Sequence, residues 1–232
     1  MCGRYTIIAK AEAIEKKFDV SVPDAYQPRY NAAPTQLLPV ISDNNPSELS
    51  FYYWGMIPRW AKEKNVSTKL INARAESILE KASFKTALLQ RRCLVVSDGF
   101  YEWKRMSKTS RVPYRIRHKN DDVFAYAGLW DEYDDEDQNR IKTFTIITTN
   151  ANRIVSKIHD RMPAILDSEA GKAWLDKKQS IGALIELLRP FDPDNMEAYT
   201  VSSQVNKATA DHPQMIAAAP SADQFGNLTL FD

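Results

Sequence analysis

The 232-residue chain lacks the features that define several classes of protein. Its only two cysteines, Cys2 and Cys93, cannot build a disulfide framework, and no C-x-x-C pair is present. With 7 glycines and 12 prolines, the chain is neither collagen-like nor a glycine-rich linker. No apolar run approaches the roughly 18 residues of a membrane span, and the first residues, MCGRYTII, do not form a secretory signal. We therefore expect a cytoplasmic protein with no membrane partner, whose thiols stay reduced.

Motifs for common cofactors are also missing. The three histidines and two cysteines are far apart and show no metal-ligand spacing such as H-x-x-x-H. No G-x-G-x-x-G, Walker glycine loop or G-x-S-x-G occurs, which disfavours Rossmann enzymes, P-loop enzymes and serine hydrolases. A cysteine–histidine hydrolase stays open as an alternative. We expect neither a metal ion nor a cofactor.

The net charge of +1 hides an uneven distribution of charged residues. Residues 131–137 read DEYDDED, which is six acids without a base. Residues 103–119 hold seven basic residues without an acid. The basic segment suits a polyanion such as nucleic acid, although two solvated loops of opposite sign would give the same pattern.

The spacing of apolar residues predicts a mixed fold. Strands are predicted at residues 4–8, 37–41, 49–54, 93–97, 100–104, 113–117, 123–130, 142–148 and 198–202. Helices are predicted at residues 11–18, 76–92 (with a break near Ser83), 168–176 and 181–188, and the proline-rich residues 23–34 should be irregular. Because strands follow one another without alternating helices, we expect an α+β fold. It would be a single domain over residues 1–232, with a bent, mainly antiparallel, barrel-like sheet surrounded by helices.

Cys2 is the first residue whose position suggests chemistry. A second residue this small normally allows removal of Met1, which leaves an α-amine of pKa about 7.7–8.0 beside a thiol of pKa about 8.5. The amine can condense with an aldehyde to an imine, and the tethered thiol can then close a five-membered thiazolidine. The alternative is a frayed terminus without a function. In either case we expect a terminal thiol to bury little area.

Three polar residues further along the chain are candidates for proton transfer or positioning. Asn72 lies just ahead of a predicted helix, where helix capping is the alternative. Glu102 lies on a predicted strand between two aromatic residues, where partial burial would raise its pKa and suit it to acid–base catalysis. Pairing with Lys104 is the alternative role for Glu102. His159, in a loop that ends at a proline, suits a proton shuttle, with a structural role as the alternative.

Six motifs together resemble those of one family. MCGRYT, PRYNAAPT, YWGMIPRW, INARAES, SDGFYEWK and IHDRMP occur in the order and approximate spacing of the SOS-response-associated peptidase (SRAP) family of abasic-site processing proteins. The motifs span residues 1–166, a less distinctive part extends to about residue 208, and residues 209–232 form a tail. The resemblance implies binding to single-stranded DNA and covalent capture of abasic sites. We expect the chain to act as a monomer.

The resemblance also implies a role for each candidate in the reaction. Cys2 is the nucleophile through both its amine and its sulfur, and Asn72 holds and orients the Cys2 terminus. Glu102 is the acid/base that assists sugar ring opening and imine formation. His159 moves protons as well, including when the crosslink reverses. β-Elimination of the DNA strand from the imine, a lyase reaction, would compete with thiazolidine closure.

Further residues are expected to face DNA. The resemblance assigns phosphate contacts to Arg4, Arg74 and Arg161, base support or stacking to Pro34, Trp60 and Trp103, and positioning of the sugar to Thr148. Ala61 stands where family members often carry a second aromatic residue, which predicts a smaller stacking wedge. The acidic run 131–137 is interpreted as a loop insertion that faces away from DNA.

Two other functions stay open. A thiol peptidase using Cys2 and His159 would turn over peptides even with Met1 in place, and the family name records a proposed peptidase activity. A non-covalent binder of single-stranded DNA would need only the basic segment, and its affinity would be sensitive to salt. Thiazolidine formation, in contrast, requires that Met1 is removed, because the Met1–Cys2 peptide bond occupies the Cys2 amine.

Overall fold

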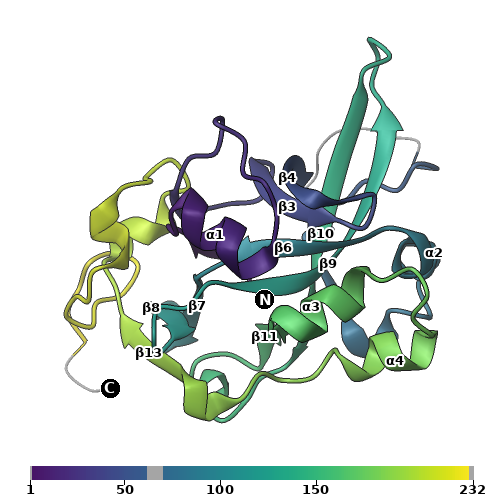
Figure 1. The fold of residues 1–232 in the computed structure, drawn as a ribbon. Coiled ribbons are helices and arrows are strands. Elements are labelled where there is room, and N and C mark those ends of the chain that lie inside the picture. The colour runs from purple at the N-terminus through teal and green to yellow at the C-terminus, as the bar shows by residue number, and fades with distance from the viewer. Residues whose placement is uncertain (1, 62–69, 230–232) are drawn as a thin grey trace.

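The computed structural model describes residues 2–61 and 70–229, and their strands form two sheets (Figure 1). In the larger sheet, five strands close into a barrel in the order β4–β3–β6–β9–β10, with β10 pairing back onto β4. The strands of this sheet are β3 (Leu37–Ser42), β4 (Asn45–Trp54), β5 (Asn72–Arg74), β6 (Arg92–Ser97), β9 (Phe124–Asp134), β10 (Arg140–Asn150), β11 (Arg161–Pro163) and β12 (Ile165–Leu166). Within the barrel only the β10–β4 pairing is parallel. The predicted α+β fold with a bent, mainly antiparallel core is confirmed.

The smaller sheet carries the N-terminal strand in the order β13–β8–β7–β1–β2, and all its pairings are antiparallel. Its strands are β1 (Arg4–Ile7), β2 (Arg29–Ala32), β7 (Gly99–Arg105), β8 (Arg111–His118) and β13 (Met196–Thr200). Tyr5 of β1 joins this sheet to the barrel, because its ring lies 5.2 Å from that of Trp54 and 5.9 Å from that of Tyr126. Edge-to-face aromatic contacts of this kind add to the free energy gained by burial. The start of β1 is therefore held firmly against the barrel.

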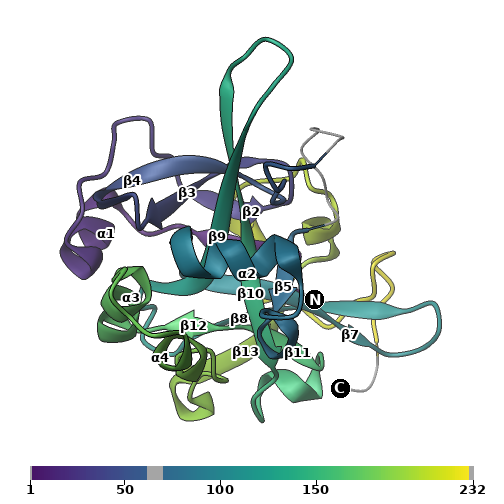
Figure 2. The same cartoon turned by 90° about the vertical axis from the view of Figure 1, so that its right-hand side faces the viewer.

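Helices α2 (Ala82–Gln90) and α3 (Ser168–Leu175) cover the barrel on the side of β6 and β9 (Figure 2). The other helices are α1 (Ala11–Phe18) and α4 (Ile181–Glu186), and 3-10 turns span Ala75–Ser77, Val155–Lys157, Pro193–Asn195, Ser203–Asn206 and Pro213–Ile216. Side chains cap two of the helices: Asp167 accepts a hydrogen bond from Ala170 N (2.8 Å) at α3. Ser180 accepts one from Ala183 N (3.2 Å) at α4. Such caps satisfy backbone N–H groups that the helix leaves unpaired.

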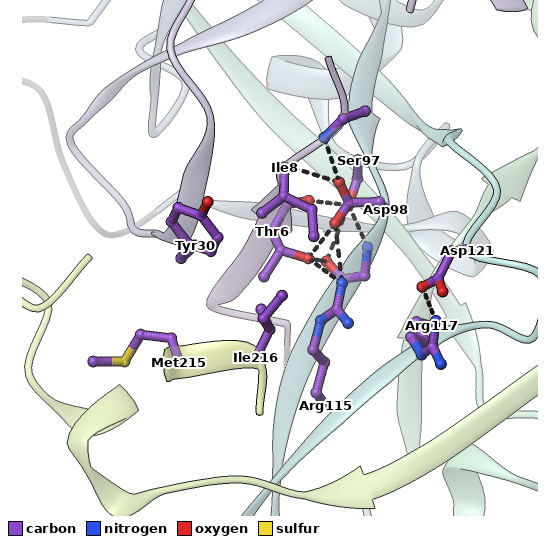
Figure 3. A network of polar contacts seen from close by, with 12 residues as sticks. Thr6, Ile8, Tyr30, Ser97, Asp98, Arg115, Arg117, Asp121, Met215 and Ile216 are labelled. Atoms are coloured by element: carbon purple, nitrogen blue, oxygen red, sulfur yellow. Dashed lines mark hydrogen bonds and ion pairs between the residues drawn. The ribbon is translucent and has the colours of Figure 1, made fainter. Parts of the chain in front are cut away.

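A buried carboxylate fastens the far end of β1 to β7 and β8 (Figure 3). Asp98 Oδ1 accepts hydrogen bonds from Thr6 Oγ1 (2.6 Å) and Arg115 Nη2 (3.2 Å). Its Oδ2 accepts from the backbone N–H groups of Ile8 and Ala9. Four donors thus compensate the desolvation of one charge. With Tyr5 packed in the barrel and Asp98 bonded at the other end, β1 has a fixed register beside β7.

Three predictions of local structure need correction. The proline-rich residues 23–34 are not wholly irregular, because β2 forms between Pro28 and Pro34 as an edge strand of the smaller sheet. The predicted helix 76–92 is a 3-10 turn at 75–77 followed by α2 at 82–90. The acidic run 131–137 is not a loop throughout, since its first four residues belong to β9. That strand and β10 form a long hairpin that projects from the body (Figures 1 and 2).

Candidate active site around Cys2

Cys2 lies two residues before β1 and is completely buried. Its Sγ contacts the carbonyl oxygen of Arg4 at 3.7 Å. Burial raises the pKa of the Cys2 thiol far above its usual range, and the negative charge of Glu102 raises it further. The expectation that this thiol buries little area is wrong, because the strand that follows is docked on the barrel. At neutral pH the sulfur is a protonated thiol.

Asn72, the first residue of β5, holds the main chain of Cys2. Its Nδ2 donates a hydrogen bond to the carbonyl oxygen of Cys2 at 2.9 Å. The parallel pairing of β5 with β10 places Asn72 opposite Ile146. Within residues 2–61 and 70–229, the buried Oδ1 of Asn72 has no hydrogen-bond partner. The amide thus fixes Cys2 through one atom and offers a buried acceptor through the other.

Glu102 approaches Cys2 from β7, the strand next to β1. Arg4 is paired with Tyr101, so the chain just before Arg4 runs toward the position of Glu102. The Glu102 side chain is buried, with only 2% of the residue exposed. Burial raises its pKa from an ordinary value of 4.5 to about 7. A carboxyl group with this pKa exchanges protons readily at physiological pH.

His159 completes the group, in the short segment between the 3-10 turn Val155–Lys157 and β11. Its Nε2 lies 4.0 Å from Glu102 Oε2. Its Nδ1 lies 3.0 Å from Arg161 N, which donates to it, and 3.0 Å from Asp160 Oδ1, so Nε2 is the ring nitrogen that faces Glu102. Partial burial lowers the pKa of His159, so the neutral ring predominates at neutral pH. The four predicted catalytic residues are therefore brought together from four separate segments.

The loop that carries His159 is tied to the segment that carries Asn72 by an ion pair. Arg161 Nη1 and Nη2 donate to Glu76 Oε1 (2.7 Å) and Oε2 (2.8 Å) in a fork-to-fork arrangement. The same guanidinium donates to Asn150 Oδ1 (2.8 Å) and to the carbonyl oxygen of Thr148 (2.7 Å). The hydrogen bond from Arg161 lowers the pKa of Glu76. This two-pronged geometry restricts both orientation and distance.

Comparison with known proteins places this site in a family. The model of the SOS response associated peptidase (SRAP) family matches residues 1–208. The chain belongs to the SRAP family. The abasic site processing protein YoqW of Bacillus subtilis is 42% identical over 221 residues, which cover 93% of this SRAP chain and 99% of that protein. The abasic site processing protein HMCES of Rattus norvegicus is 33% identical over 237 residues, which cover 85% of this chain and 67% of that protein.

Solved structures share the fold of this chain. A protein from Bacteroides thetaiotaomicron superposes on the SRAP chain with a TM-score of 0.83 at 29% identity, over 94% of this chain and 100% of the other. A protein from Bordetella bronchiseptica superposes with a TM-score of 0.74 at 25% identity, over 87% of this chain and 100% of the other. Both structures thus share the overall fold of this chain.

Two of the arginines expected at phosphates are bound within the SRAP fold. Besides Arg161, Arg4 donates to Asn31 Oδ1 (2.9 Å) and to the carbonyl oxygens of Val205 (2.6 Å) and Asn206 (3.2 Å). These donors bind the protein itself, so the structure gives both arginines a structural role that the sequence interpretation did not include. Arg74, in contrast, is exposed at the end of β5. It is the expected phosphate contact that solvent reaches most freely.

The remaining DNA candidates differ in how exposed they are. Trp60 is 66% exposed, and Pro34 and Ala61 are partly buried. Trp103 is partly buried, and its Nε1 donates to Asn206 Oδ1 at 2.7 Å. Thr148 is completely buried, with its Oγ1 3.4 Å from the carbonyl oxygen of Ala73. Among these residues Trp60 is therefore the aromatic side chain most open to a nucleobase.

The described residues of the SRAP chain include neither a metal-binding cluster nor a membrane-spanning helix. Across residues 2–61 and 70–229, no cluster of three or more His, Cys, Asp or Glu side chains could hold a metal ion. Of the helices in these ranges, none is long and apolar enough to cross a membrane.

Proposed function

We propose that this SRAP protein processes abasic sites in DNA, by binding the single strand and forming a thiazolidine crosslink through Cys2. The names of its relatives YoqW and HMCES, both abasic site processing proteins, support the substrate class. The observation that carries the mechanism is the buried Glu102 carboxyl, whose pKa is about 7 and whose charge acts on the Cys2 thiol. Met1, whose removal the mechanism requires, lies outside the described residues.

In the first step the freed amine of Cys2 attacks the aldehyde carbon of the open-chain sugar. As the closed sugar opens, protonated Glu102 donates to the ring oxygen and its carboxylate takes the proton of the C1 hydroxyl, which becomes the aldehyde oxygen. After the amine attacks, Glu102 gives this proton to the carbinolamine hydroxyl, which leaves as water, while the nitrogen loses one proton to that oxygen and one to Glu102. The product is an imine between the Cys2 nitrogen and the sugar carbon. Asn72 holds the Cys2 carbonyl during this step, so the neighbouring amine keeps its orientation toward the aldehyde carbon.

In the second step the Cys2 sulfur adds to the imine carbon. Its proton must leave, because burial keeps the thiol protonated. Glu102 in its ionised form accepts this proton and the imine nitrogen receives one, so that charge and atoms balance, with His159 Nε2 lying 4.0 Å from the Glu102 carboxyl. Closure of the ring removes the imine from which β-elimination would break the strand. Lyase chemistry therefore competes only while the imine is open.

The directions of the pKa shifts at Cys2 and His159 favour this reaction over a peptidase acting on peptides. A cysteine peptidase depends on a thiolate beside a protonated histidine, which requires a lowered thiol pKa. Here the pKa of Cys2 is raised and the pKa of His159 is lowered, both opposite to that requirement. A purely non-covalent DNA binder would leave the convergence of Asn72, Glu102 and His159 on Cys2 without a purpose.

Intact mass spectrometry tests the proposal. Mature protein lacking Met1 is mixed with a single-stranded oligonucleotide that carries one abasic site. The expected product is a denaturation-resistant adduct with the mass of protein plus oligonucleotide minus one water. Cys2→Ser keeps the amine and should yield only an adduct that hydrolyses on denaturation. Cys93→Ser, which alters the other buried thiol, is the matched control and should react like the wild type.

The proposal fails if mature wild-type protein forms no stable adduct, or if Cys2→Ser forms one of equal stability. Turnover of a peptide panel by protein that retains Met1 would instead favour the peptidase.

A further inference from the structure

The first acid of the acidic run is a buried anchor for the loop that carries Trp60. Asp131 is only 2% exposed, and its Oδ2 accepts a hydrogen bond from the backbone N–H of Arg59 at 3.1 Å. Its Oδ1 lies 3.3 Å from Arg59 Nε and 3.2 Å from Arg91 Nε, and also accepts from Glu132 N at 2.9 Å. The carboxylate thus binds both the main chain and the side chain of the residue next to Trp60.

A second side chain on the neighbouring strand holds the same loop. Thr143 of β10 is paired directly with Asp131 of β9. Its Oγ1 accepts a hydrogen bond from the backbone N–H of Ile57 at 2.9 Å, and the residue is completely buried. One cross-strand pair at the base of the β9–β10 hairpin therefore fixes the loop at residues 57 and 59. Such side-chain acceptors replace the ladder bonds that an irregular segment lacks.

Trp60 follows directly on the anchored residue 59. The turn continues with a hydrogen bond from Ala61 N to the carbonyl oxygen of Pro58 at 2.8 Å, so the backbone on both sides of Trp60 is held. Yet its side chain is 66% exposed. A large aromatic ring that is held by its backbone and left open to solvent is prepared to stack on an unpaired base, since little conformational freedom is lost on binding.

We propose that Asp131 and Thr143 are positioning residues that hold Trp60 ready to stack on the single strand beside the abasic site. This inference deepens the proposed function and rests on it. It also changes the interpretation of the acidic run, whose first member would promote DNA binding although it carries the same charge as DNA.

The direction in which Asp131→Asn changes DNA affinity distinguishes a positioning role from simple charge repulsion. Removing a negative charge near a DNA-binding face should strengthen binding. If Asp131 acts through Trp60, its replacement by asparagine weakens binding instead. Asp137→Asn removes the same charge at the exposed end of the same run and is the matched control. We expect it to leave affinity unchanged within about twofold or to tighten it.

A double-mutant cycle tests the proposal. The probe is a single-stranded oligonucleotide with a tetrahydrofuran abasic analogue, which has no aldehyde and reports binding alone. Stacking on one base predicts that Trp60→Ala raises Kd about tenfold. Asp131→Asn should raise Kd about three- to tenfold in the wild-type background and have no further effect when Trp60 is alanine. Thr143→Val, which removes the acceptor for Ile57 N and the donor to the Asp131 carbonyl oxygen at nearly constant volume, should show the same coupling if Asp131→Asn does not fold.

The crosslinking rate at saturating DNA gives a second readout. Positioning of Trp60 affects binding, so this rate should stay within about twofold of wild type with a true abasic oligonucleotide. Additive effects of Asp131→Asn and Trp60→Ala, tighter binding by Asp131→Asn, or an unchanged Kd in Trp60→Ala would each overturn the proposal. Absence of a crosslink in the wild type would refute the proposed function, while the binding cycle would still decide the role of Asp131 and Thr143.

Discussion

Replacing Glu102 with glutamine should make the protein more stable, and increasingly so as the pH rises from 5 to 7. In the folded protein the carboxyl group keeps its proton up to about pH 7, whereas in the unfolded chain it loses the proton near its ordinary pKa of 4.5. Between these values the folded state binds more protons than the unfolded state. The stability of the wild type therefore falls as pH rises through this window.

The magnitude follows from the two pKa values. A gap of about 2.5 pH units, at about 1.4 kcal/mol per unit, corresponds to about 3 kcal/mol once Glu102 is fully ionised. About 2 kcal/mol of this arises between pH 5 and 7, which for a chain of this size is about 4–8 °C in melting temperature. Glutamine has the shape of the carboxyl group but no charge to bury, so it avoids this loss.

Urea unfolding of both proteins at pH 5, 6, 7 and 8 measures the effect. The free-energy difference between them should grow with pH and level off above pH 7, while an exposed control, Glu80→Gln, should give a constant difference. Glu102→Gln should also slow crosslinking about 100-fold, because it loses proton transfer. A stability difference that does not change with pH would refute the assignment of a pKa near 7 to this residue.

Two further predictions concern the residues that hold the site together. Asn72→Ala removes the amide that binds the Cys2 carbonyl and should lower stability by about 1 kcal/mol, measured by urea unfolding, while slowing crosslinking at saturating DNA more than it weakens binding. An unchanged crosslinking rate would show that this hydrogen bond does not orient Cys2. Arg161→Lys keeps the charge but cannot form the forked pair with Glu76, so its melting temperature should fall and its crosslinking rate should drop at a temperature where it is fully folded. If thermal scanning shows no loss, the pair does not contribute to the fold.

Local features of the fold could be predicted from the sequence because short-range spacing determines them. The helix at residues 11–18 was predicted with the observed bounds, since its apolar residues repeat at helical spacing. The strand β2 was missed because it lies between two prolines and forms only as the partner of β1 at a sheet edge. Closure of the barrel by the parallel β10–β4 pairing is a contact between distant segments, and no local pattern indicates it.

In the candidate site too, the sequence motifs predict individual residues but not the contacts between distant segments. The motifs identified Cys2 and the three residues that converge on it, but not which of their neighbours hold them. Arg4 is bonded to Asn31 of a second motif, and Arg161 is paired with Glu76 of another. Asn31 and Glu76 both lie in the family motifs, and this membership was the only indication from the sequence that they have a role. Asp131 gave no such signal, because an acid within an acidic run resembles a solvated side chain.

The site also has a consequence for the order of events during synthesis. Cys2 leaves the ribosome almost first, and 157 residues separate it from His159. At about 5–20 residues per second, the histidine follows about 8–30 s later. Through that interval the nascent chain has its aminothiol but neither the acid–base pair nor the barrel beside it. If the proposed reaction holds, its acid–base assistance therefore begins only when translation of the last motif is complete, and a truncated chain would lack Glu102, His159 or both.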